Sequence, residues 1–289
     1  MFEKILCPTD FSENSIKALQ WAERLTQKFQ SELVIVHVLS IPQPGFASAF
    51  NFEAYREKAV SALTSFVSAL RVKHETVMSI GEPARAILQI SRNLKSTGIV
   101  MGTRGVKGAI HKILGSTTEN VIRESEIPVL TISPECVVPD DFNHKRILLP
   151  ISSLDTAIPG NVRFRKIIRE MKASVRLFHV VDMKDPMFRV FLCSAPFQLL
   201  DCEMNNRKHQ LQNLGAALSS TFTDIDVDPL IQFGEVPDEI LGEIKAHPYD
   251  AVLMCVKEQT LISRFLESIA YKVISGSSIP VITIRTTRK

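Results

Sequence analysis

The sequence lacks the features that mark membrane, secreted and nucleic-acid-binding proteins. No apolar run in its 289 residues is long enough to span a bilayer. The first residues, MFEKILCPTD, carry charges and a proline where a signal peptide needs an apolar run. The net charge is only +3, so no strong positive field favours nucleic acid. We therefore expect a cytoplasmic protein with no membrane span and no nucleic-acid partner.

Cysteine pairs and common catalytic motifs are also absent. The five cysteines form no CxxC pair, and this odd count indicates reduced thiols in the cytosol. The sequence contains neither GxxxxGKS/T nor GxGxxG nor HExxH, and it lacks the SGGxDS and HxGH motifs of related nucleotide-using enzymes. No catalytic residue and no metal site is therefore assigned, and fast catalysis is not expected.

A tandem repeat divides the chain into two halves. The segment KILCPTDFS at Lys4–Ser12 matches RILLPISSL at Arg146–Leu154, with an offset of 142 residues. Further on, IPVLTI at Ile127–Ile132 matches IPVITI at Ile279–Ile284, with an offset of 152 residues. Landmarks that recur in the same order indicate a duplicated domain. The predicted domains are residues 1–135 and 144–289.

Each half alternates strand-like apolar runs with helix-like segments. In the first half the runs KILCPT, LVIVHVL, ETVMSI, GIVMGT and PVLTI are short and nearly continuous, which is typical of a parallel sheet covered on both faces. We therefore predict an α/β fold of two tandem doubly wound domains. Each would have a five-stranded parallel sheet of order 3-2-1-4-5.

Helix signals lie between these runs. Ser12 is placed to cap the first helix, and Pro83 is placed in the first turn of a later one. A further helix is predicted over Phe52–Leu70. The first helix should bury one apolar face, which carries Ile16, Leu19, Ala22, Leu25 and Phe29.

Spaced glycines and hydroxyls follow the fourth predicted strand. Gly102 and Gly105 lack side chains, so the backbone there can turn sharply and approach a ligand. After nine intervening residues, Gly115 precedes Ser116 and Thr117 at the start of a predicted helix. Free N–H groups and hydroxyls at a helix amino end form an anion site suited to phosphate. Ordinary turn chemistry is the alternative explanation of these glycines.

Two roles can be considered for the basic residues and for the histidines. Arg104, Lys107 and Lys112 could add positive charge to a phosphate site, or they could be solvated surface. His37 and His179 occupy the same strand position in the two halves. We expect each imidazole to be packed near a strand end and hydrogen-bonded rather than to bind a metal.

Together these residues match a known pattern. The chain resembles tandem universal stress proteins, and the resemblance covers both halves. Their nucleotide-binding members carry glycine, two residues, glycine, nine residues, then glycine and Ser or Thr. This chain has the pattern as Gly102, Gly105, Gly115 and Ser116. Asp10, in PTDFS, matches an aspartate that such proteins place at the end of strand one.

The resemblance implies that the first half binds ATP. Asp10 and Ser116 could help to hold Mg²⁺ beside the nucleotide. The residues implied in binding are Pro8, Thr9 and Asp10 at adenine and ribose, Val38 at the base, Met101 and Gly102 flanking the nucleotide, Arg104 adding positive charge, and Gly105, Gly115, Ser116 and Thr117 at the phosphates.

The second half departs from this pattern. Ser152 replaces Asp10, Cys255 stands at the position of Gly102, and Glu267 at that of Gly115, with only the hydroxyl of Ser268 retained. Glu267 would place a negative charge where a phosphate should lie. We expect no ATP in the second half.

The second half also gains 11 residues within Val181–Phe233. The added segment is apolar and is broken by two prolines. It is interpreted as a helix packed on the sheet or on its sister domain, or alternatively as an apolar ligand pocket or a partner-docking surface. Its apolar residues are Met183, Met187, Phe188, Phe191, Leu192, Phe197, Leu199 and Leu200.

Three functions remain open from the sequence. The first is an ATP-binding regulator of the stress response, with the nucleotide in the first half. The second is a non-enzymatic scaffold or carrier of an apolar ligand, and the third is a weak ATPase. The PVLTI and PVITI runs are expected to be sheet edges, and in proteins of the resembled type such edges pair between tandem halves or in a homodimer.

Overall fold

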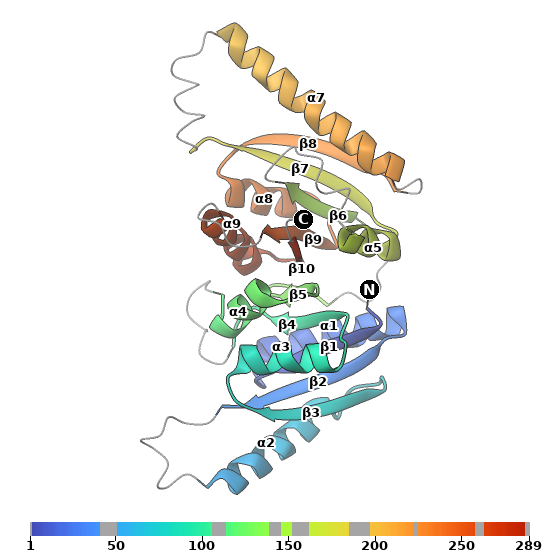
Figure 1. Cartoon of the computed structure of the whole chain (residues 1–289), viewed down its shortest axis with the longest axis vertical. Coiled ribbons are helices and arrows are strands. Elements are labelled where there is room, and N and C mark those ends of the chain that lie inside the picture. Colours follow the sequence, from blue (N-terminus) through green and yellow to red (C-terminus); the bar gives the residue numbers. More distant parts are fainter. Residues whose placement is uncertain are drawn as a thin grey trace. The chain divides into compact units, whose positions relative to one another are not determined.

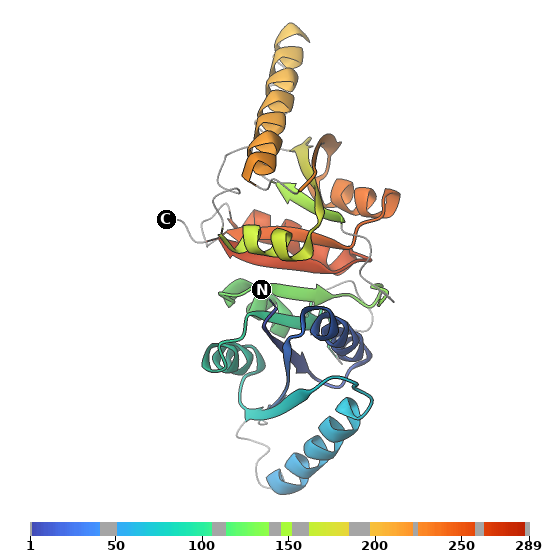
Figure 2. The same ribbon diagram turned by 90° about the vertical axis from the view of Figure 1, so that its right-hand side faces the viewer.

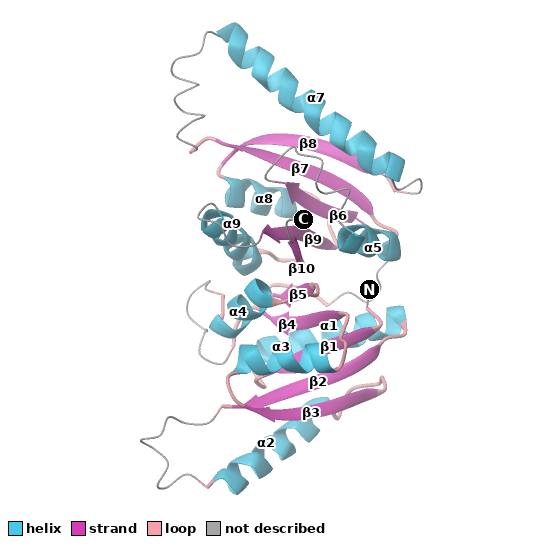
Figure 3. Cartoon of the chain, in the orientation of Figure 1, coloured by secondary structure: helices cyan, strands magenta, loops and turns pink. Residues whose placement is uncertain are grey.

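The computed structural model describes two compact units, Met1–Val138 and Pro139–Lys289. The predicted domains 1–135 and 144–289 fall within them. Within each unit, strands and helices alternate along the chain (Figures 1 and 3). The described residues are 2–40, 51–105, 114–138, 146–151, 162–184, 197–221, 225–257 and 263–286.

The first unit contains a parallel sheet of order β3-β2-β1-β4-β5, in which every described strand pair is parallel. The predicted fold class and strand order are therefore confirmed for this unit. In chain order its elements are β1 (Lys4–Thr9), α1 (Glu13–Phe29), β2 (Glu32–Leu39), α2 (Phe52–Val67), β3 (His74–Ile80), α3 (Pro83–Asn93), β4 (Gly98–Gly102), α4 (Ser116–Glu124) and β5 (Val129–Ile132).

Helices cover both faces of this sheet. Figure 2 shows α1 in dark blue and α3 in teal on opposite sides of the strands. The central strands are buried nearly throughout, as expected for a sheet with two covered faces. Ser12 caps α1 and Pro83 lies in the first turn of α3, which confirms both predictions.

The prediction of which α1 residues are buried is wrong for one residue. Ile16 is 43% exposed, whereas Leu19, Ala22 and Leu25 are buried as predicted. The buried stripe is shifted because Trp21, together with polar residues of the first turn, occupies the side that contacts the sheet. Apolar spacing alone could not show this shift, since Ile16 fits the same helical period.

The second unit repeats this architecture with sheet order β8-β7-β6-β9-β10. Its register repeats as well, because Leu148 pairs with Arg176 as Leu6 pairs with Val34. The elements are β6 (Arg146–Ile151), α5 (Val162–Met171), β7 (Ser174–Asp182), α7 (Phe197–Thr221), β8 (Val227–Gly234), α8 (Val236–Ala246), β9 (Ala251–Lys257), α9 (Ser263–Gly276) and β10 (Val281–Thr286).

The insertion of the second half includes a long helix. Helix α7 has 25 residues, whereas its counterpart α2 has 16. Its later turns bury Leu211, Leu214 and Leu218, and the helix packs on β8 and β7. Of the predicted apolar cluster, Met183 is 40% exposed. The stretch from Met187 to Leu192 and the side chains of Phe197, Leu199 and Leu200 lie outside the described residues.

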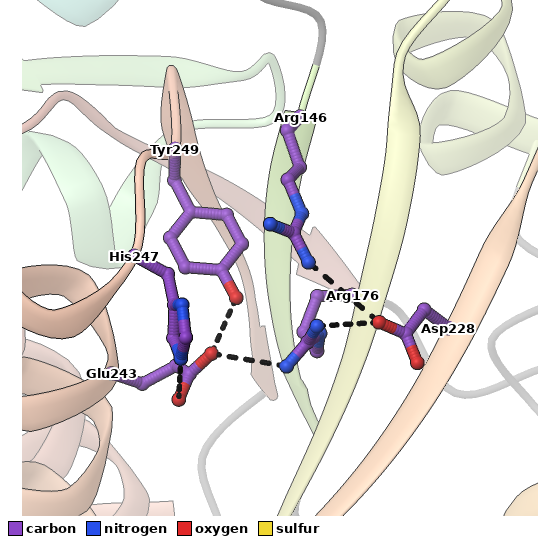
Figure 4. A network of polar contacts seen from close by, with 6 residues as sticks. All are labelled: Arg146, Arg176, Asp228, Glu243, His247 and Tyr249. Carbon is purple, nitrogen blue, oxygen red and sulfur yellow. Dashed lines mark hydrogen bonds and ion pairs between the residues drawn. The ribbon is translucent and has the colours of Figure 1, made fainter.

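A charge network lies at the amino ends of the second unit's strands (Figure 4). The Arg176 guanidinium, on β7, contacts Asp228 Oδ2 at 2.5 Å and Glu243 Oε1 at 3.3 Å. Glu243 is buried, and it also accepts a hydrogen bond from the Tyr249 hydroxyl at 2.5 Å. Arg146 lies over the Tyr249 ring at 5.0 Å and 3.6 Å from Asp228. Buried charges of this kind are tolerated only when paired.

Candidate functional site

The turn between β1 and α1 is held by its own side chains. The Thr9 hydroxyl accepts a hydrogen bond from the Phe11 N–H at 3.0 Å. Asp10 Oδ1 accepts from the N–H and the hydroxyl of Ser12, at 3.1 and 2.6 Å. Phe11 has a φ of 64°, a left-handed conformation that is unusual for a bulky side chain. The turn therefore presents the exposed side chain of Asp10 at the carboxyl end of β1.

An aromatic cluster supports this turn. The Phe11 ring stacks on the His37 ring with centroids 4.3 Å apart, and it meets Phe66 edge-on at 5.6 Å. His37 Nδ1 lies 2.9 Å from the Thr9 carbonyl oxygen, which can only accept, so Nδ1 carries the hydrogen. The prediction that His37 is packed and hydrogen-bonded near a strand end is confirmed.

The structure brings two of the spaced glycines together. β4 ends at Gly102, and the next residue, Thr103, donates its N–H to the Ile132 carbonyl at 2.9 Å. The Thr103 carbonyl accepts from the Gly115 N–H at 2.8 Å. A Cβ atom on Gly115 would lie 3.7 Å from the Gly105 nitrogen. Gly105 and Gly115 are therefore adjacent in space although they are distant in sequence.

Asp10 reaches this glycine pair from the neighbouring strand. A Cβ atom on Gly105 would lie only 2.5 Å from Asp10 Oδ2. β1 and β4 pair directly, so their carboxyl ends meet at one edge of the sheet. This is the edge where doubly wound sheets bind ligands. The two loops that the sequence pattern singled out are thus side by side.

The amino end of α4 lies at the same place. Gly115 is its N-cap residue and supplies no side-chain cap. The Thr118 hydroxyl turns inward and donates to the Gly102 carbonyl at 2.9 Å. Ser116 is exposed and Thr117 is half-buried. The first-turn amides and the positive end of the helix dipole therefore lie at the same edge of the sheet as Asp10, and groups of this kind attract anions.

The other predicted residues differ in placement. Pro8 and Met101 are buried near the ends of β1 and β4, and Val38 is half-buried near the end of β2. The guanidinium of Arg104 lies beside a carboxylate of the protein: its Nη2 is 3.8 Å from Glu135 Oε1, in the segment after β5. The structure thus directs the Arg104 charge to a carboxylate of the protein.

Two further basic residues, Lys107 and Lys112, lie outside the described residues. The sequence reasoning also missed one residue of the site. Asn14, buried in the first turn of α1, donates an amide hydrogen bond to the Arg104 carbonyl at 3.3 Å. The signal in the sequence was an amide side chain two residues after the helix cap Ser12, on the side that α1 buries.

The second unit places Cys255 where the first has Gly102. Cys255 pairs with Ile284 on β10, as Gly102 pairs with Ile132 on β5. The predicted correspondence of these two positions is confirmed by the strand register. Glu267 and Ser268 belong to α9, but their side chains lie outside the described residues, as does Ser152.

His179 is more deeply buried than its counterpart in the first unit. It is 5% exposed, and its Nδ1 donates to the Ile151 carbonyl at 3.0 Å, so the prediction for this histidine is also confirmed. Burial lowers the pKa of His179 below its usual 6.5, although the bond to Ile151 opposes the shift and Arg207 adds to it. The folded state therefore favours the neutral imidazole.

We expect the second unit to lose stability as pH falls below about 6.5. There the unfolded chain protonates His179 while the folded chain does not, so the free energy of unfolding falls by up to about 1.4 kcal/mol per pH unit. Urea unfolding followed by far-UV circular dichroism, at about pH 7.5 and about pH 5.5, measures this. His179→Asn keeps a donor towards Ile151 and should reduce the change in unfolding free energy between the two pH values. If the change stays the same in this variant, other groups cause the pH dependence.

Two hollows of the first unit lie away from this site. A groove of about 340 Å³ runs between α3 and α4, and a hollow of about 300 Å³ lies on α2. Within the described ranges, no group of three or more His, Cys, Asp or Glu side chains is arranged to hold a metal ion. In the same ranges, none of the helices has the length and apolar character required to cross a membrane.

Sequence comparisons place the first unit in a known family. A model of the universal stress protein family matches residues 1–133. Universal stress protein MJ0531 of Methanocaldococcus jannaschii is 30% identical over 140 residues, which covers 46% of this chain and 82% of the relative. Universal stress protein YxiE of Bacillus subtilis is 31% identical over 148 residues, which covers 46% of this chain and 99% of the relative.

A solved structure resembles the chain over its whole length. A universal stress protein from Archaeoglobus fulgidus superposes with a TM-score of 0.69, 21% identity and coverage of 99% of both chains. At this identity the match speaks for the fold alone. Together with the family match and the relatives of the first unit, it leads to one conclusion: the chain belongs to the universal stress protein family.

Proposed function

We propose that the first unit binds ATP at the edge where β1 and β4 meet, and that the protein acts as a nucleotide-dependent regulator of the stress response. The phosphates would lie between Gly105, Gly115 and the first turn of α4. Adenine and ribose would lie towards Pro8, Asp10 and Val38. In this arrangement the helix dipole and backbone N–H groups neutralise phosphate charge.

The observation that carries this proposal is the contrast among the three glycines. At Gly102 and Gly105 a Cβ atom would come within 2.8 and 2.5 Å of the protein's own side chains. At Gly115 the closest atom of the described residues would be 3.4 Å away, an ordinary contact, and its φ of −67° suits any residue. Among the described residues, packing and backbone conformation therefore do not require glycine at 115. A need for room beside the amino end of α4, where the phosphates are proposed to lie, would account for the glycine.

The donor set also fits a magnesium nucleotide. Asp10 and Ser116 offer a carboxylate and a hydroxyl beside the proposed phosphates, and Mg²⁺ prefers such oxygen ligands. Bound Mg²⁺ would neutralise phosphate charge, and the residues around it would fix the nucleotide's position. In the second half Glu267 would repel a phosphate, so we propose that only the first unit binds ATP.

Calorimetric titration of the full chain with ATP, with and without Mg²⁺, tests this function. We expect saturable heat at a single site and tighter binding with Mg²⁺. Native mass spectrometry of the purified protein checks the result independently, since it reports carried nucleotide, bound lipid and dimer in one measurement. Absence of both heat and a nucleotide adduct would overturn the proposal, and phosphate release would identify a weak ATPase.

A further inference from the structure

Asn14 joins helix α1 to the glycine segment of the other loop. It is only 7% exposed and lies in the first turn of α1. Its Nδ2 lies 3.3 Å from the Arg104 carbonyl and 3.4 Å from the Thr103 hydroxyl, and it donates to both. Among the described residues its Oδ1 is buried without a partner. A buried polar atom without a partner is rare in native structures, so this amide calls for an explanation.

Asn14 also fills the space beside Gly102. A Cβ atom on Gly102 would lie 2.8 Å from Asn14 Nδ2 and 3.1 Å from its Cγ. Any side chain at 102 would therefore push the amide or the strand end aside. Glycine at this position is explained by the protein's own packing, without a ligand.

The contacts of Asn14 continue to the proposed phosphate site. Thr103, which Asn14 contacts, accepts the N–H of Gly115 at 2.8 Å. Gly102 accepts the hydroxyl of Thr118, in the first turn of α4, at 2.9 Å. A shift of Gly102–Arg104 would therefore move the amino end of α4.

We infer that Asn14 is a positioning residue of the nucleotide site: it sets the place of the glycine segment, and thereby of the α4 amides, relative to Asp10. This inference rests on the proposed function. The second half supports the pairing of the two positions, since there Thr156 stands in place of Asn14 and Cys255 in place of Gly102. A smaller side chain accompanies the loss of the glycine.

A double-mutant cycle on the full chain tests this inference. Mg-ATP affinity and the thermal unfolding temperature are measured for wild type, Asn14→Ala, Gly102→Ala and the double variant. Asn14→Ala should weaken ATP binding about 10-fold, because the segment loses two hydrogen bonds. Gly102→Ala should cost about 10-fold or more in the wild-type protein, but less than about 2-fold when Asn14 is already alanine.

Thr26→Val is the matched control, since Thr26 is also a buried polar residue of α1 but lies far along the helix. It should leave ATP affinity unchanged whatever it does to stability. Wild-type affinity in Asn14→Ala, or an equal cost of Gly102→Ala in both backgrounds, would overturn the inference while leaving ATP binding intact. If the wild type binds no ATP, the proposed function fails, and with it the positioning role. The same cycle in unfolding temperature then decides whether Asn14 is the reason for glycine at 102.

Discussion

Replacing Arg176 by methionine lowers the free energy of unfolding of the second unit by about 3 to 5 kcal/mol. The substitution leaves the buried Glu243 carboxylate without its arginine, and in the network of Figure 4 it then keeps only the Tyr249 hydroxyl and His247, whose Nε2 lies 3.9 Å away and is charged only when protonated. A buried charge without a counter-charge is far less stable than the same charge in water. Arg176 itself is only 14% exposed at its side chain, so solvent cannot substitute for it.

The first unit shows how the same positions can be filled without charge. Its residues at the equivalent strand and helix positions are Val34 and Ile90. Replacing Arg176 by valine, Glu243 by isoleucine and Tyr249 by phenylalanine removes the buried part of the network, including the hydroxyl that would lose its acceptor, and leaves the contact between Arg146 and Asp228. We expect the free energy of unfolding of this triple variant to lie within about 2 kcal/mol of that of the wild type, because apolar replacements of buried ion pairs are often neutral.

Two optical signals separate the units in this measurement. The chain has a single tryptophan, Trp21, which is buried in α1 of the first unit. Guanidinium unfolding followed by tryptophan fluorescence therefore reports the first unit, whereas far-UV circular dichroism reports both. The loss in Arg176→Met should appear in the dichroism transition.

A surface ion pair provides the control for charge alone. Lys166 lies 3.8 Å from Glu170 on α5 and is half exposed, so Lys166→Met should change stability by less than about 1 kcal/mol. A loss below about 1 kcal/mol in Arg176→Met, or a triple variant as unstable as the single one, would contradict the role given to the buried network.

Gly115→Glu should weaken ATP binding by about 100-fold or more. The substitution reproduces the residue that the second half carries at this position, Glu267. Its carboxylate would stand at the amino end of α4, where the proposal places the phosphates. Two negative groups would then compete for the same amides, and like-charge contact of this kind costs several kcal/mol.

The fold should tolerate this change. The backbone at Gly115 is extended, with φ −67° and ψ 140°, and a Cβ atom there meets only ordinary contacts. We therefore expect the free energy of unfolding to change by less than about 1 kcal/mol. The combination of a native fold and lost affinity would separate a binding defect from misfolding.

Calorimetric titration with Mg-ATP and denaturant unfolding, on the same preparation, measure both quantities. Gly242→Glu is the matched control, because Gly242 is exposed on α8 and its Cβ position has no atom within 4 Å. It adds the same charge outside the proposed site and should bind ATP as the wild type does. A titration of Gly115→Glu that matched the wild type would remove the phosphate site from the amino end of α4.

Much of the architecture could be predicted because it follows from local patterns. The apolar runs and their alternation with helices gave the parallel sheets, and the repeated landmarks gave two copies of one fold. The strand order is confirmed in both units. The resemblance implied that Gly105 and Gly115 both lie at the phosphates, and the structure places the two residues side by side.

Side-chain partners were harder to predict because they depend on residues far apart in the sequence. Asn14 meets Gly102 across 88 positions, and no local pattern reports that contact. Arg104 was predicted either to add positive charge at the phosphates or to be solvated surface, and the sequence did not indicate that its Nη2 lies 3.8 Å from Glu135 Oε1. The buried network did leave one trace in the sequence, an arginine in the mostly apolar strand SVRLFHV, at the place where the first half has valine.

The contrast among the three glycines has a consequence for how such a domain can change over time. Two of them touch a protruding side chain of the β1–α1 segment, whereas Gly115 touches none so closely. If the proposed site is correct, a copy that no longer binds a nucleotide can lose Gly115 in one mutational step, but it must first replace Asn14 or Asp10 by a smaller residue before it can lose Gly102 or Gly105. In the second half the first of these pairs differs at both positions, since Thr156 and Cys255 stand where the first half has Asn14 and Gly102.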